Sequence, residues 1–159
     1  MSERLILIRH GKAEDHGIRK DFDRELTQKG IEEIEQMAPE LAKRIDGRDA
    51  VIITSPLVRA KQTADLLAEV IAVPVEVENW VADGVYSKVL ATQKRQEHVV
   101  ILVGHNPDFD RWHVHLTGEE QHFKKGAAAM YRWTEEGKVR LEWMKTAKQI
   151  AKGDIPDEA

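Results

Sequence analysis

Three runs of consecutive aliphatic residues stand out from an otherwise mixed chain, at residues 5–8, 51–53 and 99–103. Continuous apolar runs of this length are typical of strands that are buried on both faces, as in parallel sheets. Between the first two runs the apolar residues recur at helical spacing, at Ile31, Ile34, Met37, Leu41 and Ile45. The alternation of strand-type and helix-type patterns predicts an α/β fold with three α/β/α layers around a mainly parallel central sheet.

The first helix is expected to begin at Thr27, which suits an N-cap, and to kink or restart at Pro39. Ser55 and Pro56 are expected to open the second helix, with Ser55 as its N-cap. Residues 79–84 are predicted to form a loop. The other expected elements are strands at 3–9, 50–54, 75–78 and 98–103, helices at 85–95 and 107–117, and a hairpin of 127–134 with 138–144 around residues 135–137.

The chain has 159 residues, enough for one domain with a sizeable core, which we place at residues 1–146. The apolar pattern is lost beyond this point, so residues 147–159 are predicted to be a flexible C-terminal tail. The formal net charge of -4 argues against general nucleic-acid binding, which uses a basic surface. The lack of cysteine excludes disulfides, zinc–thiolate sites and thiol nucleophiles.

No apolar stretch approaches the about 20 residues that a membrane-spanning helix requires. We therefore expect a cytoplasmic protein without membrane association. Nothing in the sequence demands an assembly larger than a monomer.

Two histidines and two arginines are delivered to the edge of the sheet where ligands of α/β proteins bind. His10 and His105 each follow an apolar strand, and Arg9 precedes His10 directly. Arg59 lies shortly after the strand at residues 50–54. Two guanidinium groups beside two imidazoles favour an anion, and phosphate fits their fork geometry best.

The motifs around these residues resemble those of the histidine phosphatase superfamily, and the small size resembles its SixA-type branch, the phosphohistidine phosphatases. The motifs are Arg9-His10-Gly11, residues 55–64 and Gly104-His105-Asn106-Pro107, with support from residues 24–30 and 123–127. Each of the three main motifs follows a strand, and the resemblance covers about residues 3–145. It implies a phosphoglycerate mutase-like fold with a minimal cap, because only about 20 residues separate the strands at 75–78 and 98–103.

By this resemblance His10 is the nucleophile, which attacks phosphorus and forms a covalent phosphohistidine intermediate. Arg9, Arg59 and His105 bind the phosphoryl oxygens and stabilise the charge of the transition state. Gly11 and Asn106 are predicted to lie at the same phosphate site. The resemblance implies neither a metal nor another cofactor.

The candidates for a general acid are Asp83, in the stretch after the third strand, and Glu14, in the loop after His10. Either carboxylate is more typical of a solvated loop residue than of a general acid. A phosphohistidine substrate removes the need for a strong acid, because its leaving imidazole can carry its own proton near neutral pH. We therefore expect a phosphatase that acts on phosphohistidine in a protein, with an uncovered site and a charged loop at residues 19–24 that could touch the partner.

Three alternatives stay open: a phosphatase of small phosphorylated metabolites, a phosphatase of phosphoserine or phosphothreonine, and a catalytically idle phosphoprotein-binding module. A metal site at His113, His115 and His122 is not favoured. His113 and His115 are two residues apart, which places them on different faces of a helix.

Overall fold

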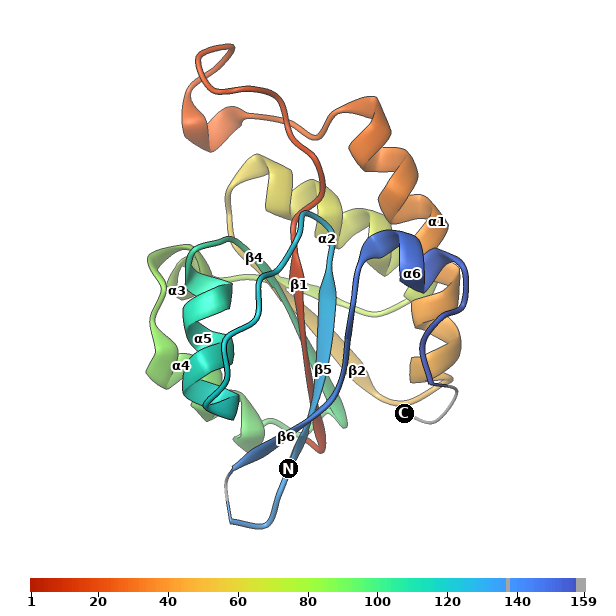
Figure 1. Ribbon diagram of the computed structural model, residues 1–159, viewed down its shortest axis with the longest axis vertical. Coiled ribbons are helices and arrows are strands. Elements are labelled where there is room, and N and C mark those ends of the chain that lie inside the picture. The colour runs from red at the N-terminus through yellow and green to blue at the C-terminus, as the bar shows by residue number, and fades with distance from the viewer. Residues whose placement is uncertain (137, 157–159) are drawn as a thin grey trace.

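The computed structural model describes residues 1–136 and 138–156, and one six-stranded sheet runs through its centre (Figure 1). The strands are β1 (Arg4–Arg9), β2 (Ala50–Thr54), β3 (Val75–Val77), β4 (Val99–Gly104), β5 (Ala128–Trp133) and β6 (Val139–Lys145). Their order is β3-β2-β4-β1-β5-β6; the first four are parallel, and β5 and β6 are antiparallel additions. The predicted sheet and terminal hairpin are confirmed, although Gly137 of the predicted turn lies outside the described residues.

Alternate side chains of the central strands enter two separate cores, because successive residues of a strand point to opposite faces. In β1, Leu5 and Leu7 belong to one core, whereas Ile6 and Ile8 belong to the other. All four side chains are fully buried. The uninterrupted aliphatic run is thus explained by helices that cover both faces of the sheet.

The helices are α1 (Gln28–Ile45), α2 (Val58–Ile71), α3 (Asn79–Asp83), α4 (Tyr86–Ala91), α5 (Asp108–Thr117) and α6 (Ala147–Ala151), with short 3-10 turns η1 (Asp21–Asp23) and η2 (Thr92–Lys94). Helices α1, α2 and α6 pack on one face of the sheet, and α3, α4 and α5 pack on the other (Figure 1). The predicted three-layer α/β/α arrangement is confirmed. Within the described part of the chain, no helix combines the length and apolarity needed to cross a bilayer.

Helix α1 begins as predicted, since the Thr27 side chain accepts a hydrogen bond from the Gly30 backbone N–H at 3.0 Å. Of the kink or restart predicted at Pro39, the restart does not occur, because α1 continues through this residue as one element. Residues 79–83 form helix α3 instead of the predicted loop. The helix predicted at residues 85–95 is divided between α4 and η2.

The prediction that Ser55 caps α2 is wrong. Helix α2 begins at Val58 with Leu57 at the N-cap position, and no side chain caps it. The Ser55 hydroxyl accepts a hydrogen bond from the Leu57 backbone N–H at 3.1 Å, within the turn that precedes the helix. Ser55 itself is fully buried and directly follows β2, so its hydroxyl lies close to the ends of the strands.

The prediction of a flexible tail from residue 147 is wrong for residues 147–156. Thr146 forms a capping box with Gln149 at the start of α6, and Ile150 and Ile155 are buried in the same core as α1. Arg44 of α1 donates hydrogen bonds to the Ile155 and Pro156 carbonyls at 2.9 and 3.2 Å. Two isolated isoleucines therefore anchor a polar segment. Residues 157–159, also part of that prediction, lie outside the described residues.

Candidate active site at the carboxyl ends of the central strands

The residues that directly follow three neighbouring strands lie close together at one edge of the sheet. His10 follows β1, Ser55 follows β2 and His105 follows β4, which lies between β1 and β2 in the sheet. Backbone hydrogen bonds of 3.0 Å run from His10 N–H to the Gly104 carbonyl and from Ser55 N–H to the Val103 carbonyl. The ring centroids of His10 and His105 are consequently 5.2 Å apart.

The hydrogen bonds of His10 define its tautomer. Its Nδ1 lies 2.8 Å from the Gly11 carbonyl oxygen, which can only accept, so Nδ1 carries the proton. Nε2 is then left with a free lone pair, and the Nε–H of Arg59 donates to it at 3.3 Å. The hydrogen bond to Gly11 thus orients the ring, and its unprotonated nitrogen faces Arg59 in the pocket.

Both histidines are neutral at physiological pH. Burial lowers the pKa of His10 to about 3; the hydrogen bond to the Gly11 carbonyl opposes this, while the neighbouring His105 ring and the charges of Arg59 and Arg9 act in the same direction as burial. Burial also lowers the pKa of His105 to about 4, with further contributions from Arg59 and Arg9. His10 and His105 are only 6% and 8% exposed, so little water is available to stabilise an imidazolium.

Contacts at Nε and at both terminal nitrogens hold the guanidinium group of Arg59. It lies in the first turn of α2 with its Nε on His10, and one terminal nitrogen donates to the Asp21 backbone carbonyl at 2.8 Å. The other terminal nitrogen lies 3.5 Å from Asp21 Oδ2. The backbone of α2 is tied to the same loop because Thr63 Oγ1 accepts from Gly11 N–H and donates to the Arg59 carbonyl.

Arg9 is held through the backbone of a distant segment. Its Nη1 donates to the Phe123 carbonyl at 2.8 Å, and the Asn106 side chain donates to the same oxygen at 3.1 Å. The Phe123 N–H in turn donates to Asp110 Oδ1 at 2.8 Å, so Asp110 fixes the position of this carbonyl. The Asn106 side-chain oxygen accepts from Asp110 N–H, which orders the start of α5.

His105 is oriented by Ser55, which the sequence analysis assigned to a helix cap. Ser55 Oγ and His105 Nε2 are 2.7 Å apart. His105 Nδ1 is buried and has no partner among the described residues. An unpartnered ring nitrogen beside two arginines is suited to an external hydrogen-bonding group, such as a phosphoryl oxygen.

The glycines next to the histidines allow close backbone packing. A Cβ at Gly104 would lie 2.8 Å from the Phe109 ring and 2.9 Å from Val81. A Cβ at Gly11 would lie 3.2 Å from Ile34, and its carbonyl is the partner of His10. Gly11 therefore contributes to the site through its backbone.

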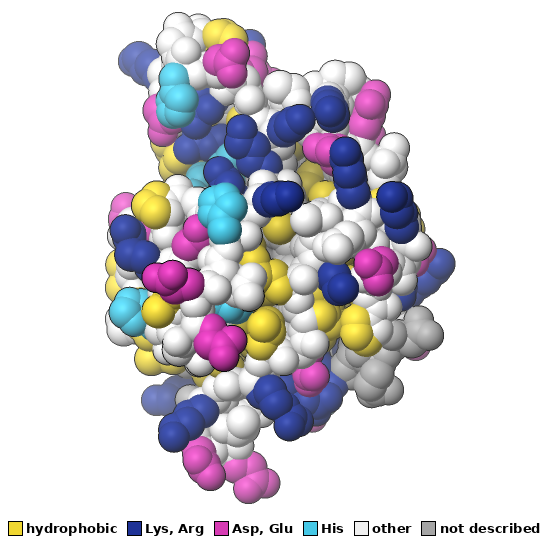
Figure 2. Space-filling model, in the orientation of Figure 1, with side chains coloured by type: hydrophobic (Ala, Val, Ile, Leu, Met, Phe, Trp, Pro, Cys, Tyr) yellow, Lys and Arg dark blue, Asp and Glu magenta, His cyan; other side chains and the backbone are white. Residues whose placement is uncertain are grey.

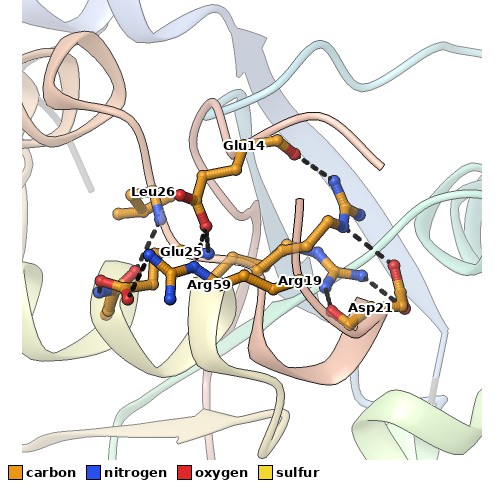
Figure 3. Close-up of polar contacts among 8 residues, drawn as sticks. Glu14, Arg19, Asp21, Glu25, Leu26 and Arg59 are labelled. Atoms are coloured by element: carbon orange, nitrogen blue, oxygen red, sulfur yellow. Dashed lines mark hydrogen bonds and ion pairs between the residues drawn. The ribbon is translucent and has the colours of Figure 1, made fainter. Parts of the chain in front are cut away.

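The predicted acid Glu14 lies at the pocket, where hydrogen bonds hold its carboxylate. Its Oε1 accepts hydrogen bonds from Arg19 Nε at 2.8 Å and from the Glu25 N–H at 2.9 Å (Figure 3). The hydrogen bond from Arg19 lowers the pKa of Glu14 below its ordinary value. The other predicted acid, Asp83, is exposed at the end of α3 and does not line the pocket.

Asp21 is a pocket residue that the sequence analysis did not single out, and it faces Arg59 in Figure 3. Burial favours its neutral form, but Arg59 and Arg24 outweigh burial and keep the pKa of Asp21 below its ordinary value. The pocket has a volume of about 360 Å³. Its lining residues are Arg9, His10, Ala13, Glu14, Asp15, His16, Asp21, Arg24, Arg59, His105, Asn106 and Lys125.

The remaining histidines of interest are dispersed. His113 is buried and bonded to the Tyr131 hydroxyl at 2.6 Å, His115 stacks on Tyr86, and His122 pairs with Asp110. Within residues 1–136 and 138–156, no group of three or more potential ligands is placed to hold a metal ion. His122 therefore belongs to the Asp110 network that supports Arg9.

Comparison with known proteins identifies related sequences and structures. The model of the histidine phosphatase superfamily (branch 1) matches residues 5–84. A protein of uncharacterised function from Picosynechococcus sp. is 36% identical over 118 residues, which are 68% of this chain and 69% of that protein.

Two solved structures illustrate the shared fold. The protein histidine phosphatase SixA complexed with tungstate superposes with a TM-score of 0.80 at 24% identity, over 92% of this chain and 99% of that one. A phosphoserine phosphatase from Entamoeba histolytica, in complex with 3-phosphoglyceric acid, gives a TM-score of 0.67 at 20% identity, over 94% and 100% of the two chains.

Proposed function

The chain belongs to the histidine phosphatase superfamily, and we propose that it removes the phosphoryl group from phosphohistidine in a protein through a covalent intermediate on His10. The observation that carries this proposal is the state of His10. Its Nδ1 is committed to the Gly11 carbonyl, and its unprotonated Nε2 faces Arg59. A neutral imidazole whose lone pair is directed into a cationic pocket is an activated nucleophile.

In the first step, His10 Nε2 attacks phosphorus in line with the bond to the substrate nitrogen. The new N–P bond forms as the old one breaks, and the substrate imidazole leaves as a neutral ring when its other nitrogen carries a proton. Arg9 and Arg59 bind the phosphoryl oxygens, and His105 donates a hydrogen bond to one of them. These fixed donors stabilise the charge that the transition state places on those oxygens.

In the second step, water attacks phosphorus and the bond to Nε2 breaks. The two water protons leave with the phosphate as dihydrogen phosphate, and His10 returns to its neutral form. The Nδ1 proton stays on the ring throughout, hydrogen-bonded to the Gly11 carbonyl, so the ring needs no external base to recover its starting tautomer.

The acid–base character of the pocket supports a P–N bond as the substrate. Of the three carboxylates that line it, at Glu14, Asp15 and Asp21, those of Glu14 and Asp21 are ion-paired with arginines and have lowered pKa values. An alkyl phosphate needs a proton donor for its leaving alkoxide. Phosphohistidine does not, because imidazole leaves as a neutral base near pH 7. The function named for SixA among the structural relatives agrees with this preference.

The test is dephosphorylation of a protein phosphorylated on histidine, in the presence of EDTA. We expect rapid release of phosphate by the wild type and none by His10→Ala, with His98→Ala as the matched control because His98 is an exposed histidine outside the pocket. A radioactive phosphoryl group should be trapped on the wild-type protein but not on His10→Ala.

The alternatives give different results in this assay. Equal efficiency on phosphohistidine and on alkyl phosphates would contradict the P–N preference and favour a phosphatase of metabolites or of phosphoserine. A protein that binds vanadate yet never carries a covalent label would be a binding module.

A further inference from the structure

A second hollow adjoins the catalytic pocket and shares Arg9 and Lys125 with it. Its volume is about 430 Å³. Four separate parts of the chain line it: the end of β1 with the loop after it, α1, the segment before β5, and the start of α6. We refer to it as the basic groove, after its cationic residues Arg9, Lys12, Lys124, Lys125 and Lys148.

The charge of the basic groove is not balanced by the protein. Glu33 is the one carboxylate that lines it within the described residues, against five cationic side chains. Figure 2 shows Lys and Arg side chains gathered over the upper part of this face, in a protein whose net charge is -4. The groove thus concentrates positive charge beside the pocket while the rest of the molecule carries the excess of negative charge.

Within the described residues, the lysines of the basic groove lack the carboxylate partners that some other surface lysines have. Lys43 and Lys61 each form an ion pair at 2.7 Å with a carboxylate of their own helix. Within the described part of the chain, the side-chain ammonium groups of Lys124, Lys125 and Lys148 form no ion pair or hydrogen bond. The nearby ammonium of Lys29 holds the pKa of Lys12 below its ordinary value. Neighbouring cations that repel one another are relieved when an external anion binds.

The form of the groove favours a protein over a small molecule. Its four lysines are exposed, and their long side chains have no fixed partners. A small anionic ligand is normally held by ordered donors in a site largely closed to solvent, as the phosphate pocket provides. Mobile exposed charges instead give long-range attraction and orientation to an acidic protein surface.

We propose that the basic groove docks an acidic surface of the phosphorylated protein substrate, and so presents its phosphohistidine to His10. This inference rests on the proposed function. Because Arg9 and Lys125 line both hollows, a protein that lies along the groove has its phosphoryl group at the edge of the catalytic pocket. The groove would select phosphoproteins with carboxylates next to the phosphohistidine.

The test compares two charge-reversed double variants on two substrates. Lys124→Glu/Lys148→Glu changes the basic groove, and Lys88→Glu/Lys94→Glu makes the same change in net charge at exposed lysines outside both hollows. The substrates are a histidine-phosphorylated protein with an acidic surface and the free amino acid phosphohistidine. We expect the groove variant to lose about tenfold or more in kcat/KM on the protein at low salt, through KM. Its activity on the free amino acid should be unchanged, and the loss should shrink at about 0.5 M salt.

Each failure has its own signature. If the wild type acts on the phosphoprotein but both variants lose equally, or neither does, the docking proposal is overturned while the proposed function stands. If the wild type cleaves neither phosphohistidine substrate, the proposed function is overturned and the docking proposal with it. Binding of duplex DNA at physiological salt that only the groove variant abolishes would reassign the surface to nucleic acid.

Discussion

The catalytic pocket and the basic groove are adjacent and both cationic, yet they are built in opposite ways. In the pocket, His10, Arg59 and His105 are buried and each has a defined hydrogen-bond partner. In the groove, the lysines are exposed and have no fixed partners within the described residues. Bond making requires a nitrogen in a set position and protonation state, whereas attraction between proteins requires only charge of the right sign.

The largest expected effect concerns His10, the proposed nucleophile. His10→Ala should lower kcat by about a thousandfold or more on every phosphorylated substrate, because no other described residue places an unprotonated nitrogen against Arg59. Single-turnover assays with a radioactive phosphoryl group measure this directly. A variant of the groove, such as Lys124→Glu, should keep the single-turnover rate on free phosphohistidine, and equal losses in both variants would remove the distinction between the regions.

Burial of the two histidines also predicts how stability depends on pH. Their pKa values in the fold are about 3 and about 4, against ~6.5 in an unfolded chain. Between these values the unfolded state binds more protons, so the free energy of unfolding falls as pH decreases from about 6.5 toward 4, by a few kcal/mol. Above about pH 6.5 both states are neutral at these sites and the contribution is fully present.

Urea unfolding at pH 7, 5.5 and 4.5 tests this dependence. His10→Asn should flatten the curve, because the variant has no imidazole to protonate, whereas Lys124→Glu/Lys148→Glu should not. Parallel curves for the wild type and His10→Asn would show that His10 is not the group whose burial destabilises the fold in acid.

Arg59→Lys tests whether the fork geometry or only the charge matters in the pocket. A lysine keeps the charge but cannot donate at once to His10, to the Asp21 backbone carbonyl and to a phosphoryl oxygen. We expect about a hundredfold loss in kcat/KM, with weaker inhibition by vanadate. Arg95→Lys is the matched control, since Arg95 forms its ion pairs with Glu76 and Glu97 away from the pocket. Retention of full activity would place Arg59 among residues that supply charge alone, like those of the groove.

The sequence predicted those features that depend on local pattern. Aliphatic runs located the central strands, and His10 and His105 were assigned to the strand ends because each lies beside its strand in the chain. Ser55 was misassigned, because a Ser-Pro pair is typical of a helix start and its contact with His105 comes only from the neighbouring strand. Asp21 and Asp110 gave no local signal, since each acts on a residue from another segment. The tail was misjudged because Ile150 and Ile155 are isolated in sequence.

The smallest expected effect lies behind the pocket, at Asp110, which we predict to be a positioning residue. Asp110→Ala removes the acceptor for Phe123 N–H and so frees the carbonyl that holds Arg9. We expect about a tenfold loss in kcat/KM. Inhibition by inorganic phosphate should weaken by a similar factor, because Arg9 would no longer be fixed where it meets the phosphoryl oxygens.

Two further variants separate positioning from general stability. Asp110→Asn keeps an oxygen that can accept from Phe123 N–H, so it should recover most of the phosphate affinity. His122→Ala removes only the outer partner of Asp110 and should have a smaller effect than Asp110→Ala. If Asp110→Ala lowers the melting temperature but leaves phosphate inhibition unchanged, Asp110 merely stabilises α5. The position of Arg9 would then depend on the Phe123 carbonyl and on Asn106, with no contribution from Asp110.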